Sequence, residues 1–439
     1  MTPGARLAAA IEVLSDIGAR RRPAADTLKD WGLSHRFAGS GDRAGIAGLV
    51  YDSLRRRASS AYLMGEDTPR ATALGMLVRE RGLDPDAVAL LASGAGYAPQ
   101  PLTEAERARL AATDLAGAPP HVHGDYPEWL DPYLARVFGD ERAEEGAALA
   151  SRAPLDLRAN ALKATRDEAA RSLADLAPEP TRWSPHGLRI KLRADAKNPA
   201  VHAEFAYLKG LVEIQDEGSQ LAALLAGAKP GEQVLDLCAG GGGKTLALAA
   251  LMENKGQLYA TDDDKRRLAP IHDRLDRSGA RNVQVRTPKS VGNELADLEG
   301  KIDLVLIDAP CTGIGAWRRN PDAKWRVRPG ALEVRVKEQG ETLERAVPLV
   351  RPDGRIAYVT CSVLDEENGA QIRNFIGRHP DFSVEKPAEV ANALGERAYM
   401  FSKAALVSGE GVLMTPRRTD TDGFFVSLLR RSIRVWAAP

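Results

Sequence analysis

The sequence predicts three parts: an all-α N-terminal domain, a small α+β module, and an α/β domain built on a mostly parallel sheet. At 439 residues the chain is longer than one ordinary core accommodates. Helical spacing dominates its first quarter, whereas short apolar runs alternate with helical patterns after about residue 231. Prolines cluster near residue 120. We therefore expect domains at residues 1–120, 121–225 and 226–439.

The first domain is expected to be helical because Ala, Leu and Arg dominate residues 1–115. Asp42 is a candidate N-cap for a helix whose apolar stripe consists of Ile46, Leu49, Val50 and Leu54. The arginine trios at 20–22 and 55–57 are candidates for phosphate contacts, although a run of charge more often forms a solvated face.

The middle module follows a proline-rich linker over residues 116–132. Its patterns predict short strands between helices. We expect strands at 155–162, 187–192 and 207–214, and helices at 129–137, 166–176 and 219–225.

The large domain alternates strands and helices regularly, which favours right-handed βαβ units with helices on both faces of a parallel sheet. A further strand at 424–429 is expected to pair at an edge. The parallel strands are predicted at 233–237, 257–261, 282–286, 304–307 and 355–360.

The stretch Gln233–Thr245 predicts a buried strand that breaks into a glycine loop and opens a helix. Glycines let the backbone approach a ligand, and the helix start offers free N–H groups to it. The spacing matches neither a Gly-x-Gly-x-x-Gly fingerprint nor a phosphate loop, which disfavours a nucleoside triphosphate. A glycine turn without a ligand is the alternative.

Polar residues at the ends of parallel strands are candidate ligand contacts, because ligands lie beyond those ends. Asp262 closes the second strand, where an acid accepts hydrogen bonds from ribose hydroxyls. It indicates a cofactor that carries a nucleoside. The alternative is that Asp262 caps a helix beginning near Lys265.

The three cysteines, Cys238, Cys311 and Cys361, are too few for a disulfide framework and form no close metal-binding pair. All three follow predicted strands. If the strands before Cys311 and Cys361 are neighbours, two thiols face one cavity. We interpret Cys238 as a packing residue, which is also the alternative for the other two.

Two thiols beside a nucleoside cofactor suit methyl transfer to carbon 5 of a pyrimidine. A thiolate that adds at carbon 6 makes carbon 5 nucleophilic, and a second group then removes the proton from carbon 5. Asp308 is expected to hold the amine or ring nitrogen of cytosine, or to contact the cofactor. The base has to leave its helix or arrive single-stranded.

The residues after Cys311, 312–328, interleave basic side chains with Trp317 and Trp325. This mixture predicts a grip on RNA, with phosphate contacts and stacking surfaces. A solvated basic loop with tryptophans in the core is the alternative.

The charge balance, with 60 Lys and Arg against 60 Asp and Glu, gives no global field for nucleic acid, so any basic surface has to be local. No apolar run reaches the roughly 20 residues that span a bilayer, and no secretory signal begins the chain. We expect a cytoplasmic protein without a membrane partner.

Three motifs resemble the RNA (cytosine-5) methyltransferases of the Nol/Nop/Sun family, and most closely their bacterial ribosomal RNA branch. They are Asp236–Thr245, Asp308–Cys311 and Thr360–Asn368. The segment Arg158–Lys163 is similar to one that the family carries before its catalytic domain. Residues 41–50 resemble the helical RNA-binding domain of the antitermination factor NusB.

The resemblance implies a Rossmann-like methyltransferase domain that binds S-adenosylmethionine and acts on RNA, with ribosomal RNA as the expected substrate and a monomer as the expected state. Cys361 is implied as the nucleophile, Cys311 as the group that assists product release, and Asp308 as a contact in the shared pocket. The implied cofactor contacts are Cys238, Ala239, Gly240, Gly241, Gly242, Gly243, Lys244 and Asp262.

One departure leaves alternatives open: residues 285–289 lack the acid that the family places after the third strand. Weaker cofactor binding follows unless Thr287 or a backbone group substitutes. The other hypotheses are a transfer RNA substrate, an RNA-binding assembly factor without turnover, and a dinucleotide-dependent oxidoreductase.

Overall fold

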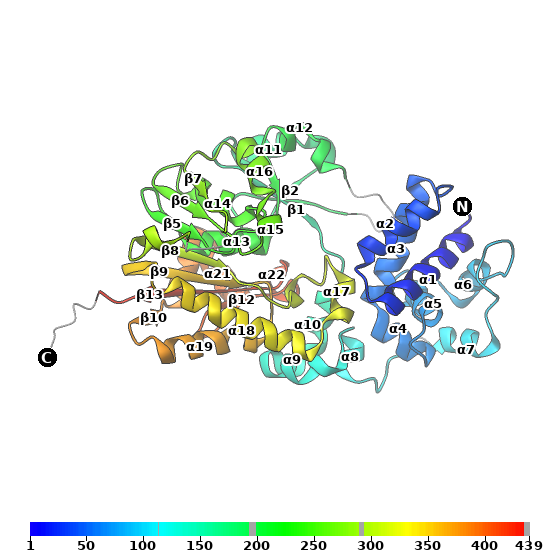
Figure 1. The fold of residues 1–439 in the computed structure, drawn as a ribbon. Coiled ribbons are helices and arrows are strands. Elements are labelled where there is room, and N and C mark those ends of the chain that lie inside the picture. Colours follow the sequence, from blue (N-terminus) through cyan, green and yellow to red (C-terminus); the bar gives the residue numbers. More distant parts are fainter. Residues whose placement is uncertain (113, 193–198, 289–293, 434–439) are drawn as a thin grey trace. The chain divides into compact units, whose positions relative to one another are not determined.

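The computed structural model describes residues 1–112, 114–192, 199–288 and 294–433, which form two compact units (Figure 1). Unit 1 comprises Met1–Arg152 and Trp317–Arg328. Unit 2 comprises Ala153–Leu192 with residues 199–316 and 329–433. The first unit therefore extends past the prolines near residue 120 and includes a segment from the second half of the sequence.

Unit 1 is helical in all its described regular elements. Its α-helices are α1 (Pro3–Arg20), α2 (Ala24–Ser34), α3 (Ser40–Arg55), α4 (Arg57–Met64), α5 (Pro69–Arg79), α6 (Pro85–Leu91), α7 (Glu104–Ala112), α8 (Pro120–His123), α9 (Asp131–Phe138), α10 (Arg142–Leu149) and α17 (Pro321–Arg326). Short 3-10 turns lie at η1 (Glu128–Leu130) and η2 (Gly139–Glu141).

The core of unit 1 is built from the apolar faces of these helices. In α3, Ile46, Val50 and Leu54 are buried as the apolar stripe predicts, and half-buried Leu49 packs against the same cluster. The predicted N-cap is wrong. Gly39 caps α3, and the Asp42 carboxylate in the first turn accepts hydrogen bonds from the Met1 amino group and from Arg6.

The small module of unit 2 is an antiparallel sheet in the order β2-β3-β1-β4. Its elements are β1 (Leu155–Ala159), α11 (Arg166–Arg171), η3 (Ala174–Leu176), β2 (Glu179–Pro180), β3 (Gly187–Ile190), η4 (Val201–Ala203), α12 (Phe205–Leu208) and β4 (Val212–Ile214). The strand predicted over 207–214 is therefore too long. Gly210 turns the chain with φ +69°, where an added Cβ would lie 2.1 Å from the Arg277 carbonyl oxygen.

The large sheet of unit 2 has the order β11-β12-β13-β9-β8-β5-β6-β7, with β10 paired to β13. Strands β5 to β9 are parallel, as predicted. The strands are β5 (Gln233–Asp236), β6 (Gln257–Ala260), β7 (Val283–Val285), β8 (Ile302–Asp308), β9 (Val350–Thr360), β10 (Phe382–Val384), β11 (Leu406–Val407), β12 (Val412–Met414) and β13 (Phe424–Arg431).

Helices cover both faces of this sheet, with α13 and α14 on one and α18 and α19 on the other (Figure 1). The helices and turns are α13 (Glu217–Ala226), α14 (Gly243–Leu251), α15 (Lys265–Leu268), α16 (Ile271–Ser278), η5 (Ala296–Leu298), η6 (Ile314–Ala316), α18 (Pro329–Ala346), η7 (Asp365–Glu367), α19 (Gly369–Arg378), α20 (Pro387–Val390), η8 (Ala391–Arg397), α21 (Ala398–Ala404) and α22 (Pro416–Thr419).

Strand β13 does not lie at an edge, contrary to expectation. It pairs antiparallel with β9 on one side and with β12 and β10 on the other. Its side chains are mostly buried, which an interior position requires. Among the described residues, no helix combines the length and the apolar character that crossing a bilayer demands.

Candidate active site

The two cysteines that follow β8 and β9 meet at one end of the sheet. The strands are parallel neighbours, with Asp308 opposite Val359, so their carboxyl ends deliver Cys311 and Cys361 to the same place. The two Sγ atoms lie 3.3 Å apart, and both residues are partly exposed. The hypothesis that two thiols share one site is therefore consistent with this geometry.

The thiol of Cys311 is held in its neutral form by its surroundings. The hydrogen bond between its thiol and that of Cys361, together with burial, raises the pKa of Cys311 well above its ordinary value. A hydrogen bond joins the two sulfurs, and either of them can be its donor.

Glu367 clamps the two cysteine loops, a role that the sequence did not reveal. Its buried carboxylate accepts hydrogen bonds from the Thr312 backbone N–H at 2.8 Å and from Gln339 Nε2 at 3.0 Å. It also accepts from the hydroxyls of Thr312 and Ser362, the residues that follow the two cysteines. In the sequence, the only signal for this role of Glu367 is that an acid lies inside the third motif.

Lys244 and Asp308 form an ion pair near the cysteines. Lys244 Nζ lies 2.7 Å from Asp308 Oδ2 and 5.1 Å from the centre of the Phe424 ring. Burial alone would lower the pKa of Lys244, but the Asp308 carboxylate and, more weakly, Cys361 and Asp236 raise it above its ordinary value. Lys244 is thus a buried cation beside an acid and a thiol.

The glycine loop between β5 and α14 has geometry that only glycine meets easily. Gly242 has φ +83°, and an added Cβ would lie 2.5 Å from Ile271 Cγ1. Helix α14 then begins at Gly243 without a side-chain cap, which leaves first-turn N–H groups for a ligand. The loop fits a cofactor site.

Residues of the small module and α16 hold this loop from outside it. Buried Arg158 donates to the Gly243 carbonyl oxygen at 3.0 Å, and Arg274 donates to the Gly241 carbonyl oxygen at 2.7 Å. Glu213 in turn accepts hydrogen bonds from Arg274 and Arg277. Sequence reasoning noted the segment that contains Arg158 but assigned it no role.

Asp262 lies next to the glycine loop, as its position after β6 predicts. Its Oδ2 accepts from the Gly240 N–H and its Oδ1 from the Asp264 N–H, both at 2.9 Å. Helix α15 is capped by Asp264 instead, so the alternative that Asp262 caps this helix is wrong. Oδ2 also lies 3.6 Å from the Arg267 guanidinium, and Oδ1 keeps a second lone pair for a ligand.

The region after β7 was expected to lack an acid. Arg286 there forms two hydrogen bonds with Asp297 and lies 5.2 Å from the centre of the Tyr259 ring. Lys289, the last residue of that segment, lies outside the described residues.

Cys238 is not part of the sulfur pair. It is half-buried in the glycine loop, and burial together with the carboxylates of Asp236 and Asp308 raises the pKa of its thiol. The thiol therefore stays neutral, in keeping with the interpretation as a packing residue.

The basic segment after Cys311 is not a solvated loop. Lys324 is buried, and its Nζ donates to the Arg55 carbonyl oxygen at 3.0 Å. Trp317 is buried too, whereas Arg326 and Arg328 are exposed. Only part of the predicted grip is therefore accessible.

The arginine trio at 55–57 is engaged within unit 1 rather than free for phosphates. Arg55 is buried and donates to the carbonyl oxygens of Ser151 and Arg318. Arg56 pairs with Glu80, and Arg57 pairs with Asp67. These three arginines therefore stabilise contacts within unit 1.

Comparison with known proteins gives the family. The profile of the family described as 16S rRNA methyltransferase RsmB/F matches residues 222–430. The probable ribosomal RNA small subunit methyltransferase B of Synechocystis sp. is 32% identical over 308 residues, which are 70% of this chain and 67% of that protein. The chain belongs to the RsmB/F family.

Two further proteins support this membership. The probable methyltransferase B of Bacillus subtilis is 32% identical over 309 residues, 70% of this chain and 66% of its own length. The chain thus spans about two thirds of both RsmB relatives. The crystal structure of PH0851 has a TM-score of 0.69 and 25% identity, covering 98% of this chain and 99% of that one.

Membership in the RsmB/F family agrees with the resemblance in the motifs, and the matched range contains the glycine loop and both cysteines. The large domain accordingly has the Rossmann-like fold of S-adenosylmethionine-dependent methyltransferases.

Proposed function

We propose that this protein transfers the methyl group of S-adenosylmethionine to carbon 5 of a cytosine in small-subunit ribosomal RNA. The observation that carries the proposal is the distance of 3.3 Å between the Cys311 and Cys361 sulfurs at the ends of neighbouring strands. One sulfur suits addition to carbon 6 of the base, and the other suits proton transfer beside it.

In this mechanism Cys361 adds to carbon 6 as a thiolate, which is the role that the family resemblance implies for it. The cofactor, when bound, supplies an electrophilic methyl group for carbon 5. The Cys311 sulfur, once it has given its own proton to solvent, takes the proton of carbon 5, and the electron pair of that bond re-forms the ring double bond as the bond between the Cys361 sulfur and carbon 6 breaks. The raised pKa of Cys311 makes its thiolate a strong base for this step.

Asp308 and Lys244 position the ring. The carboxylate of Asp308 suits the exocyclic amine of cytosine, and the buried ammonium of Lys244 suits the ring carbonyl oxygen, whose negative charge grows as the thiolate adds. Because the two side chains already pair at 2.7 Å, this polar wall is arranged before the base arrives.

The residues of the glycine loop fit the cofactor. The backbone of Cys238 to Lys244 can come close to the amino acid end of the cofactor and offer it uncapped N–H groups. Asp262 supplies a carboxylate for the ribose hydroxyls. Thr287 or a backbone group would take the place of the missing acid after β7.

The NusB-like character of unit 1 is also part of the proposal. Its support is the all-helical composition of the unit together with the motif at residues 41–50. A helical RNA-binding unit would bring the ribosomal RNA to the catalytic unit.

The test is transfer of labelled methyl groups to undermethylated small-subunit RNA, followed by mapping of 5-methylcytosine. We expect one labelled cytosine with the wild type, no label with Cys361→Ser, and normal transfer with the control Gly330→Ala, whose added Cβ meets open space. RNA binding without any methyl transfer by the wild type would refute the proposal in favour of an assembly factor.

A further inference from the structure

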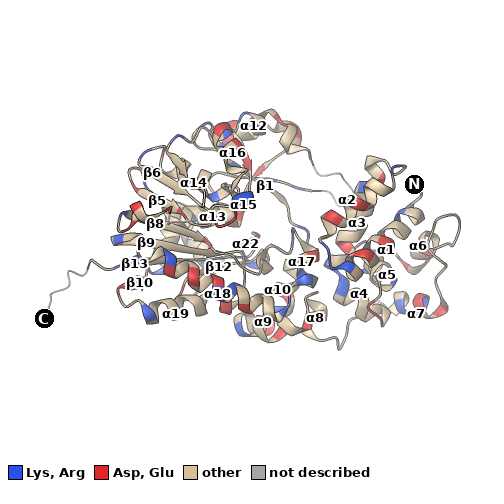
Figure 2. Ribbon diagram, in the orientation of Figure 1, with Lys and Arg blue, Asp and Glu red and all other residues tan. Residues whose placement is uncertain are grey.

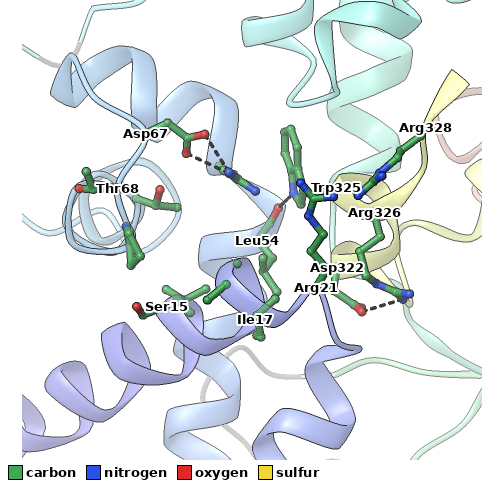
Figure 3. A pocket seen from close by; sticks show the side chains of 16 residues that line it. Ser15, Ile17, Arg21, Leu54, Asp67, Thr68, Asp322, Trp325, Arg326 and Arg328 are labelled. Atoms are coloured by element: carbon green, nitrogen blue, oxygen red, sulfur yellow. Dashed lines mark hydrogen bonds and ion pairs between the residues drawn. The ribbon is translucent and has the colours of Figure 1, made fainter.

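A second candidate site lies within unit 1, apart from the cysteines. Helices α1 and α17 and the turn before α5 enclose a cavity of about 810 Å³, the α1–α17 pocket (Figure 3). All its lining residues belong to unit 1. They are Leu14, Ser15, Ile17, Gly18, Ala19, Arg21, Leu54, Arg57, Asp67, Thr68, Pro69, Thr72, Asp322, Trp325, Arg326 and Arg328.

The lining is basic, with four arginines against two aspartates. Both acids are already paired, Asp67 with Arg57 at 2.8 Å and Asp322 with Arg326 at 3.0 Å. Arg21 and Arg328 are exposed, and no carboxylate pairs with either among the described residues. Two guanidinium groups are therefore left for an anionic ligand.

Trp325 gives the pocket a fixed aromatic wall. Its Nε1 donates to the Leu54 carbonyl oxygen at 2.6 Å, and the Arg57 guanidinium lies 5.3 Å from the ring centre. The ring is half-buried and packs against the core of unit 1, so it is held without a ligand. Figure 3 shows Arg21 and Arg328 on the side of the pocket where Trp325 lies, while Arg326 points to Asp322.

We propose that the α1–α17 pocket binds unpaired nucleotides of the RNA substrate outside the target base, with phosphates on Arg21 and Arg328 and a base against the apolar wall beside Trp325. The Trp325 ring itself already carries the Arg57 guanidinium at 5.3 Å and the Lys324 Nζ at 5.0 Å from its centre. The proposal rests on the proposed function in taking RNA as the substrate. A nucleotide strand supplies both anions and flat apolar faces, as single-stranded RNA sites require. An acidic peptide would supply carboxylates but nothing for the aromatic wall.

Charge is diffuse elsewhere on the unit. Figure 2 shows basic and acidic residues interleaved over the helices of unit 1, with basic residues on α17. The unpaired arginines of the pocket are thus a local feature in a chain whose total charge is balanced.

The first test removes the two unpaired arginines. The double variant Arg21→Ala/Arg328→Ala is compared with Arg36→Ala, an exposed arginine of unit 1 outside the pocket, for binding of a short single-stranded RNA. We expect about tenfold weaker binding for the double variant only. The slope of log affinity against log salt should fall by about 1.4, since each phosphate contact on a single strand contributes about 0.7.

The second test fills the pocket without removing charge. A Cβ added at Gly18 meets no atom within 4 Å, so Gly18→Leu places a side chain into open space while favouring the helix. Gly41 in α3 has equally open space but does not line the pocket, which makes Gly41→Leu the matched control. We expect weaker RNA binding for Gly18→Leu alone, with an unchanged or higher melting temperature.

The proposal is overturned if the double variant and Gly18→Leu both bind the RNA as tightly as the wild type, whatever the methylation result. Its failure is distinct from that of the proposed function. Methyl transfer by the wild type with pocket-independent RNA binding refutes the pocket alone. Pocket-dependent RNA binding without methyl transfer supports the pocket and refutes the methyltransferase.

Discussion

Glu367 connects the two cysteine residues through a single carboxylate. Four donors converge on it, and three of them are on the residues directly after Cys311 and Cys361. A buried donor left without an acceptor costs roughly 1–3 kcal/mol. The distance between the sulfurs therefore depends on a side chain that touches neither of them.

We predict that Glu367→Ala lowers the turnover of methyl transfer at least tenfold, because the loops lose a common acceptor. Glu367→Gln should retain most of the turnover, since its amide oxygen still accepts from the Thr312 N–H and the two hydroxyls rotate to accept from its amide. Steady-state kinetics, in which kcat and KM are determined separately, measure these effects. The control is Asp365→Asn in the same turn, whose carboxylate pairs with Arg373. Full turnover in Glu367→Ala would contradict the clamp.

The residue scale also shows where local sequence reasoning succeeds. The pairing of Cys311 with Cys361 was predictable because parallel neighbours end at one edge, and both cysteines follow strands. The role of Glu367 was not predictable, because its partners Thr312 and Gln339 lie 55 and 28 residues away in the sequence. Roles carried by long-range hydrogen bonds leave no periodic pattern.

At the scale of elements, the loop between β5 and α14 depends on close packing against α16. Gly242 combines a positive φ with contact to Ile271, so any side chain there meets both backbone strain and a clash. Arg158 and Arg274 fix the carbonyl groups on the far side of the loop.

We predict that Gly242→Ala weakens S-adenosylmethionine binding at least tenfold while RNA binding stays within about twofold, because strain of roughly 1–3 kcal/mol falls on the loop. Isothermal titration with the cofactor and a filter assay with RNA measure the two affinities. Gly330→Ala, in α18 with open space at its Cβ, is the control. Equal losses in both affinities would argue that the loop does not hold the cofactor.

Elements with strong patterns were predictable, and their partners were not. The apolar runs in the sequence predicted the bounds of β5, β6, β8 and β9 to within a few residues. The predicted edge position of β13 was wrong. An apolar strand has the same sequence pattern at the edge and in the interior of a sheet, and only the pairing of β13 with β9 and β12 shows that it is interior. The turn at Gly210, which shortens the strand predicted over 207–214, likewise depends on close contact with the Arg277 backbone.

At the scale of the molecule, the chain enters unit 1 twice. Residues 317–328 leave the catalytic unit and pack among helices of unit 1. Their contacts to Leu54 and Arg55 join residues about 270 positions apart in the sequence, as the separations of 271 and 269 show. No local pattern predicts such packing, which is why the sequence led us to expect an accessible grip on RNA over residues 312–328 and a domain boundary near residue 120.

This packing buries a lysine, and the stability of unit 1 should depend on pH as a result. Burial lowers the pKa of Lys324 from 10.5 to about 7. Between these values the unfolded chain binds more protons than the folded one, so stability rises with pH across this window.

We predict that unit 1 gains about 2 kcal/mol in unfolding free energy between roughly pH 7 and pH 9, and that Lys324→Met abolishes the gain. Urea unfolding at both pH values, read by pulsed hydrogen exchange in peptides from α3, measures it. Lys29→Met, an exposed lysine of the same unit, is the control. An identical pH dependence in the wild type and Lys324→Met would show that the buried ammonium is not the cause.

The most direct test of the sulfur pair is a search for the covalent RNA adduct. Cys311→Ala is incubated with undermethylated small-subunit RNA and S-adenosylmethionine, and the products are separated on a denaturing gel. The account predicts a protein–RNA band that mass spectrometry assigns to Cys361 and that disappears in Cys311→Ala/Cys361→Ala. Normal turnover of Cys311→Ala without such a band, or a band that persists in the double variant, would contradict it.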